Sequence, residues 1–301
     1  MNNRSLNVIK AIYKPYCYTK KGKVIILKST ENIVVVKDSS TNNIFELFTY
    51  LLSRKFTNIP VIIDKSRKDV IIYEYIEDIE YPKEQKALDL ITIVANLHQK
   101  TNFYKDVTED NFKAIYDLIQ NNIIYYQEYY ENFFNKALYE EYMSPSTYLF
   151  TKNYSKIISC LLFCQQELDN WYELVKKTDK TRVSIIHNNL SLNHHLKNQK
   201  DYLISWDKST IDTPILDLVV FYHQEYFNLN FEPILQTYNK LFPLTKEEQK
   251  LFFILISLPL QLQFNNNEFE NTIKVRYFLD YLYKTEKLVR PYYLKDQEEK
   301  K

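Results

Sequence analysis

The chain has 301 residues, of which 45% are hydrophobic and 26% charged, so it is long enough and apolar enough for two packed lobes or one large domain. Its 39 lysines and arginines nearly balance its 38 aspartates and glutamates, which excludes the global basic field that gathers nucleic acid or anionic membrane. A single glycine, Gly22, excludes the glycine-rich phosphate cradles of P-loop and Rossmann proteins.

The compartment is indicated by the N-terminus and the cysteines. The first residues lack the apolar core of a signal peptide, and no uncharged apolar run is long enough to cross a bilayer, so we expect a cytoplasmic protein. Cys17, Cys160 and Cys164 are odd in number, and the last two lie one helical turn apart. This spacing favours buried thiols over a disulfide framework or a metal site.

The first eighty residues predict a small sheet with one helix. Short β-branched runs separated by turn residues are typical of strands, and apolar residues at helical spacing indicate an amphipathic helix. The expected elements are strands over 24–27, 33–36, 60–63 and 69–75, a helix over 42–56 that starts near Thr41, and a charged turn over 64–68.

The rest of the chain is predicted to be mainly helical, with one interruption. An acidic connector at 77–80 leads into a helix around 87–98, followed by helices over 108–142 and 146–178, a strand, loop and strand within 181–206, a helix after Pro214, and further helices over 229–287. Periodicity alone therefore predicts a mixed α+β protein with a helical second half.

The interruption carries a recognisable pattern. The runs IIHNNLSLNHHL and LISWDKSTIDTPILDLVVFY resemble the aminoglycoside phosphotransferase and choline kinase-like superfamily, including its bacterial spore-coat kinase-like branch, where H-G-D-L-x-x-x-N precedes an apolar strand ending in D-[WF]-[ED]. The resemblance implies a protein kinase-like fold with a small antiparallel-sheet N-lobe (1–80) and a larger helical C-lobe (81–295) that holds a catalytic-loop-like segment (183–221). It also implies ATP and magnesium as cofactors, and adds the spore coat as an alternative location. The last residues, DQEEKK (296–301), predict a disordered, solvated tail.

The structural positions of the family pattern are retained. His187 matches the histidine that braces the catalytic loop, and Trp206 and Asp207 match the two positions after the metal-binding aspartate. Pro214 and Asp217 match the start of the following helix, where Asp217 also braces the loop.

The three chemical positions are replaced. Asn189 stands where the family has its catalytic aspartate, and a neutral amide cannot accept the proton of an attacking hydroxyl. His194 stands in place of a magnesium-binding asparagine and Ser205 in place of a magnesium-binding aspartate. Because Mg²⁺ prefers hard oxygen ligands, both changes weaken a metal site. Asp207 or Asp201 could replace the lost ligand only poorly, because a shift of two residues along a strand displaces the carboxylate by about 6–7 Å.

The N-terminal half supplies candidates for nucleotide contacts. Lys37, at the end of IVVVK, resembles the strand lysine that contacts ATP phosphates, and Glu46 resembles its partner on the helix. Lys28, at the end of IILK, is a rival for the lysine position. His98 ends an apolar helical stripe and is expected to be a packing residue.

Two functions account for this pattern. One is a pseudokinase: a scaffold or regulator that binds a protein partner, and a nucleotide as a further ligand, without transferring phosphate. The other is an active small-molecule kinase acting on a hydroxyl group, with Lys37 on the phosphates and Asp207 holding the metal. A structure with Asp207 facing Lys37 and Asn189 favours the second.

Two further functions have weaker support. A metal protein built on His187, His194 and His195 is disfavoured because adjacent residues of an extended segment face opposite sides. A nucleic-acid module has many tyrosines for stacking but no basic footprint. We therefore expect neither a nucleic-acid nor a membrane partner.

Overall fold

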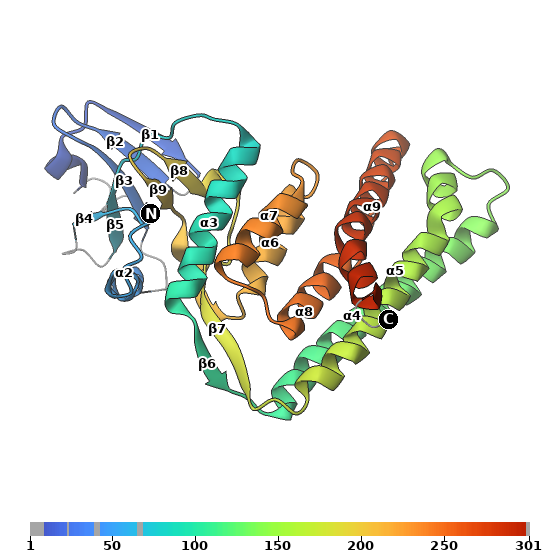
Figure 1. Ribbon diagram of the computed structural model, residues 1–301. Coiled ribbons are helices and arrows are strands. Elements are labelled where there is room, and N and C mark those ends of the chain that lie inside the picture. The colour runs from blue at the N-terminus through green and yellow to red at the C-terminus, as the bar shows by residue number, and fades with distance from the viewer. Residues whose placement is uncertain (1–8, 23, 39–42, 65–68, 299–301) are drawn as a thin grey trace. The chain divides into compact units, whose positions relative to one another are not determined.

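The computed structural model describes residues 9–22, 24–38, 43–64 and 69–298 (Figure 1). It is an α+β protein with a small antiparallel sheet and many helices, as predicted. The chain forms two compact units: Met1–Asn102 with Ser184–Ile211 and Lys240–Phe242, and Phe103–Val183 with Asp212–Asn239 and Pro243–Lys301. In the described ranges, no helix has the length and apolar character required to cross a bilayer.

The first unit contains a five-stranded antiparallel sheet (blue in Figure 1). Its order is β1-β2-β3-β5-β4, with bounds Cys17–Lys21, Val24–Lys28, Ile33–Asp38, Val70–Glu74 and Ile62–Asp64, respectively. The predicted hairpin is confirmed as β2 and β3, which pair from Val24↔Lys37 to Lys28↔Ile33. Strand β1 was not predicted, because its sequence CYTKK is exposed at every position and lacks an apolar alternation.

The two faces of this sheet have different roles. Side chains of one face form the core of the unit and pack with Ile9 and Tyr13 of a preceding helical segment: Ile25, Leu27, Val34, Val36, Val70 and Ile72. Successive side chains of a strand alternate between faces, so their neighbours point to the other side. Burial of the first set therefore fixes the register and leaves the second face available to line a cavity.

Two helices complete the sheet part of the unit. Helix α2 (Ile44–Ser53) begins at Asn43, whose side chain accepts a hydrogen bond from the Glu46 backbone at 3.4 Å. The predicted start at Thr41 and most of the predicted turn, residues 65–68, lie outside the described residues. Helix α3 (Lys83–Thr101) confirms the predicted apolar stripe.

The segment between the helical regions is more broken than predicted. After β7 (Lys180–Ile186) come a 3₁₀ helix (Leu192–His194), β8 (His195–Lys197), β9 (Asp201–Leu203), a second 3₁₀ helix (Trp206–Lys208) and β10 (Thr210–Asp212). The strand expected to continue to Trp206 ends at Leu203, because Ser205 takes a left-handed conformation with φ 69°. Strand β7 also pairs with an unpredicted strand, β6 (Phe103–Asp106).

The second unit is built from helices. Its elements are α4 (Glu109–Leu138), α5 (Pro145–Val175), α6 (Ile215–Glu225), α7 (Phe231–Leu241), α8 (Lys246–Ser257) and α9 (Glu268–Glu298). Helix α5 packs against α4, α8 and α9. Cys160 and Cys164 are free thiols on α5, and Cys164 is fully buried as predicted, whereas Cys160 is half-buried. Residues 296–298 of the expected tail form the end of α9, and 299–301 lie outside the described residues.

Candidate functional site

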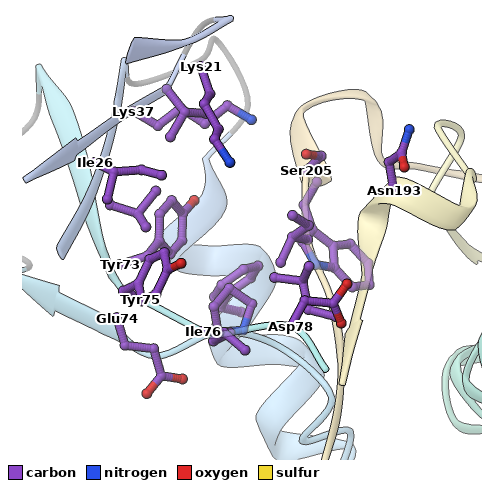
Figure 2. Close-up of a pocket in the computed structure, with 17 residues that line it drawn as sticks. Lys21, Ile26, Lys37, Tyr73, Glu74, Tyr75, Ile76, Asp78, Asn193 and Ser205 are labelled. Atoms are coloured by element: carbon purple, nitrogen blue, oxygen red, sulfur yellow. The ribbon is translucent and has the colours of Figure 1, made fainter. Parts of the chain in front are cut away.

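A cavity of about 360 Å³ lies within the first unit, against the sheet face opposite the core (Figure 2). The sheet side and α2 contribute Lys21, Val24, Ile26, Val35, Lys37, Phe48, Pro60 and Tyr73. The remaining wall comes from the end of β5 and the segment that follows it (Glu74, Tyr75, Ile76, Asp78) and from residues 193–206 (Asn193, Leu196, Ile204, Ser205, Trp206). The cavity is therefore mostly apolar with a few charged groups, which is typical of a small-molecule site.

The register of the sheet explains why its residues share the cavity. Lys21 lies opposite Val24, and Val24 lies opposite Lys37. Val35 lies opposite Tyr73 in the same way. Directly paired residues point to the same face, so the pairing places both lysines on the cavity side.

Trp206 anchors the opposite wall. It is 2% exposed, and its ring lies edge-on to Phe48 at 6.2 Å and to Phe56 at 6.1 Å between centroids. Its indole Nε1 donates a hydrogen bond to the Leu203 carbonyl at 2.7 Å. This buried contact holds the turn that contains Ser205 against α2.

The segment after β5 is tied to the β8–β9 hairpin. The Asp78 carboxylate accepts hydrogen bonds from the Lys197 backbone at 2.8 Å and from Lys86 Nζ at 2.7 Å. The Ile79 amide donates to the Lys197 carbonyl at 2.9 Å. The end of this cavity wall is thus held at Asp78 by Lys86 and by the β8–β9 hairpin.

A buried histidine supports the same hairpin. His195 contacts Tyr81 Oη through Nδ1 at 3.2 Å and Asp201 through Nε2 at 3.0 Å. Burial lowers the pKa of His195, although the neighbouring Asp201 opposes the shift. The hairpin also binds a carboxylate of α3, since Lys197 Nζ donates a hydrogen bond to Asp89 at 2.5 Å. Burial alone would raise the pKa of Asp89, but the hydrogen bonds from Lys197 and Gln85 lower it below its ordinary value.

The central charged contact of the site is an ion pair between Lys37 and Asp207. The Lys37 side chain is 14% exposed and that of Asp207 34% exposed. Burial, and then the negative charge of Asp207, raise the pKa of Tyr73, so its hydroxyl stays protonated. Asp207 therefore faces Lys37, although part of its side chain is also exposed to solvent.

The residues of the catalytic-loop-like segment are held by one another. His187 is fully buried and its Nε2 lies 2.8 Å from the Ile204 carbonyl oxygen. His194 Nδ1 lies 2.6 Å from the Asn189 carbonyl oxygen. Ser205 lines the cavity, whereas the half-buried Asn189 is not among the described residues that line it.

The other predicted residues lie elsewhere. Glu46 is exposed in the first turn of α2, while Lys37 pairs with Asp207. Lys28 is half-buried at the end of β2, away from the cavity lining. Asp217 is fully buried in the first turn of α6, in the second unit. His98 is buried with its ring 6.0 Å from that of Phe242, the geometry of a packing residue.

The residues at the expected metal positions do not fit magnesium. His194 Nδ1 is engaged by its own loop, Ser205 is neutral, and the carboxylate of Asp207 is paired with Lys37. Mg²⁺ requires several hard oxygen ligands in octahedral geometry. Over the described ranges, no cluster of three His, Cys, Asp or Glu side chains could hold a metal ion, and this includes the three histidines of the segment.

Most residues that line the cavity were not predicted as site residues, among them Lys21 and Asn193. Lys21 lies on β1, which lacks an apolar alternation, so the sequence signal for it is the turn residue Gly22, which has φ 57°. Asn193 lines the cavity one position before the expected His194. Its position follows from the 3₁₀ turn at Leu192–His194, which a sequence pattern built for an extended loop does not predict.

Comparison with known proteins identifies the fold. No protein-family model and no curated protein matches the chain. Among solved structures, an aminoglycoside phosphotransferase from Alicyclobacillus acidocaldarius superposes with a TM-score of 0.71 and 11% identity, covering 95% of this chain and 93% of that one. A spectinomycin phosphotransferase in complex with ADP and spectinomycin superposes with a TM-score of 0.52 and 12% identity, covering 95% and 97%. The chain thus has the protein kinase-like fold of these phosphotransferases.

Proposed function

We propose that this protein binds a nucleotide in the cavity of its first unit and acts as a scaffold or regulator of a protein partner, with impaired phosphoryl transfer. The observation that carries the proposal is the contrast within one site. The cavity walls and Lys37 are in place, whereas neutral Ser205 stands at the position where the family that the sequence resembles has a carboxylate, and His194 Nδ1 contacts the Asn189 carbonyl of its own loop.

The apolar and charged parts of the cavity suit the two parts of a nucleotide. Ile26, Val35 and Leu196 offer apolar surface to a base, and Lys37 offers an ammonium group to phosphate. The spectinomycin phosphotransferase with this fold was crystallised with ADP, which supports the choice of ligand class.

Transfer of the terminal phosphoryl group needs more than binding. The attacking hydroxyl must lose a proton to a positioned base, and the charge that develops on the phosphoryl oxygens must be stabilised. The Asn189 amide cannot take up the proton near neutral pH. Loss of a general base alone lowers the rate of phosphoryl transfer by a factor on the order of 10²–10⁴. We therefore expect bound nucleotide to stay intact over the time in which an active kinase would complete one reaction.

One observation favours the alternative, an active kinase with an altered site. Asp207 faces Lys37, and a carboxylate there could hold a metal ion on a phosphate. In this alternative, addition of Mg²⁺ together with a hydroxyl-bearing acceptor yields phosphorylated product. Asp207 then takes the place of the aspartate that Ser205 replaces.

The test is the thermal midpoint of the protein with millimolar ATP, together with an assay of phosphate transfer to a panel of aminoglycosides and amino alcohols. A ligand of the native state raises stability by RT ln(1 + [L]/Kd). We expect a higher midpoint for wild-type protein, a smaller shift for Lys37→Met, and an unchanged shift for the control Lys28→Met. No shift with ATP would exclude the proposal, and acceptor phosphorylation would establish the alternative.

A further inference from the structure

The proposed function assigns a nucleotide to the cavity, and the inference that follows rests on it. We infer that the nucleotide is bound as the metal-free polyphosphate, with the ammonium group of Lys21 beside that of Lys37 supplying the positive charge that magnesium supplies in an ordinary kinase site. The ligand class is therefore a nucleoside di- or triphosphate without a divalent cation.

Lys21 reaches the cavity from the end of β1. It pairs with Val24, which pairs in turn with Lys37 on β3, so the two lysines stand on one face with a single strand between them. Figure 2 shows both side chains extending from the sheet toward the opposite wall of the cavity, where Ser205 and Asn193 lie. Two ammonium groups on one face repel each other unless an anion lies near both.

The negative groups around the cavity are already engaged. Asp78 accepts hydrogen bonds from Lys86 and Lys197, and a Glu74 carboxylate oxygen accepts one from the Val61 backbone at 3.0 Å. Asp207 is paired with Lys37. Within the described part of the chain, Lys21 forms no ion pair and is exposed, so its charge is available to a ligand.

The ligand form follows from this balance of charge. A chelated metal ion cancels part of the phosphate charge and so weakens the attraction of lysine side chains for the phosphates. It also demands several oxygen ligands, but the Asp78 and Asp207 carboxylates are paired with lysines and the Glu74 carboxylate accepts a hydrogen bond from the Val61 backbone. The metal-free nucleotide keeps its full charge for the two ammonium groups, so we expect it to bind at least as tightly as the magnesium complex.

The experiment is a calorimetric titration of the full chain with ATP, once in excess EDTA and once in excess Mg²⁺. The variants are Lys21→Gln, the charge-conserving Lys21→Arg, and Lys20→Gln as the matched control. Lys20 is also exposed, but it pairs with Ile25, which belongs to the core face of the sheet. The control therefore removes the same charge from the same strand on the side away from the cavity.

In EDTA, we expect Lys21→Gln to raise the dissociation constant roughly 5- to 30-fold, which is the value for loss of one hydrogen bond to a charged group reduced by solvent screening at the exposed Lys21. Lys21→Arg should restore most of the affinity, and Lys20→Gln should change it less than about twofold. Binding that requires Mg²⁺, or equal losses in Lys21→Gln and Lys20→Gln, would overturn the inference and leave nucleotide binding standing. Absence of binding to wild-type protein under both conditions would instead remove the proposed function itself.

Discussion

Replacement of Asp207 by asparagine separates the two candidate functions most clearly. The substitution keeps the shape of the side chain and removes its charge, so Lys37 loses the carboxylate with which it is paired. If that carboxylate competes with phosphate for Lys37, the variant should bind metal-free ATP more tightly than wild-type protein does. If Asp207 instead holds a metal ion, the variant should bind Mg²⁺–ATP more weakly.

The size of the effect follows from the exposure of the pair. A hydrogen bond to a charged group is worth about 1.5–3 kcal/mol, but the Asp207 side chain is 34% exposed, and solvent screens part of that value. We therefore expect a gain in ATP affinity of about 1 kcal/mol, or about fivefold. The free energy of unfolding should fall by about 1 kcal/mol, because Lys37, only 14% exposed, is left without its counter-charge.

The assay is calorimetric titration with ATP in EDTA and in Mg²⁺, with urea unfolding for stability. Glu46→Gln is the matched control, since it removes one carboxylate from the exposed surface of α2. The control should leave both the affinity and the stability unchanged. Weaker binding of ATP to Asp207→Asn, confined to the Mg²⁺ condition, would refute the account and identify Asp207 as a metal ligand.

Three other outcomes are expected. Ser205→Asp should make ATP binding respond to Mg²⁺, because it places a second carboxylate at the cavity wall near Asp207, and aspartate tolerates the left-handed backbone there. The thermal shift with ATP should then be larger with the metal than without it, and equal shifts would contradict this. Trp206→Ala should reduce the free energy of unfolding by about 3–5 kcal/mol, measured with urea, because the indole is 2% exposed and packs on Phe48. Burial lowers the pKa of both His195 and His223 in the folded protein, with Asp201 opposing the shift at the former, so the unfolded chain binds more protons as the pH falls. The contribution of the two neutral histidines to the free energy of unfolding should therefore be fully present above a pH of about 6.5. Below that pH it should decrease by up to about 1.4 kcal/mol per pH unit for each histidine. Unfolding curves that coincide at about pH 7.5 and about pH 5.5 would contradict this.

Much of the fold could be predicted from periodicity. The β2–β3 hairpin, α3 and the long helices α4 and α5 each have a run of apolar residues with the spacing of the element that they form. Strand β1 could not be found in this way, since it lies at the sheet edge with every side chain exposed. Its pairing with β2 depends on the turn at Gly22 rather than on an apolar pattern.

The site was predicted less completely, because its contacts depend on backbone conformation. Lys37 was located from its place at the end of a strand, but the family pattern suggested Glu46 as its partner and the structure pairs it with Asp207. The positive φ of Ser205 ends the preceding strand early and changes the direction of the chain just before Asp207. An alternation rule applied to a continuous strand could not have placed that carboxylate beside the lysine.

The most direct test of the account is a crystal structure of the protein grown with ATP and EDTA. We expect electron density for the base against Ile26 and Leu196, and for the phosphates within hydrogen-bonding distance of Lys21 and Lys37, with Asp207 released from Lys37. An empty cavity, or a nucleotide that enters only with Mg²⁺ coordinated by Asp207, would contradict it.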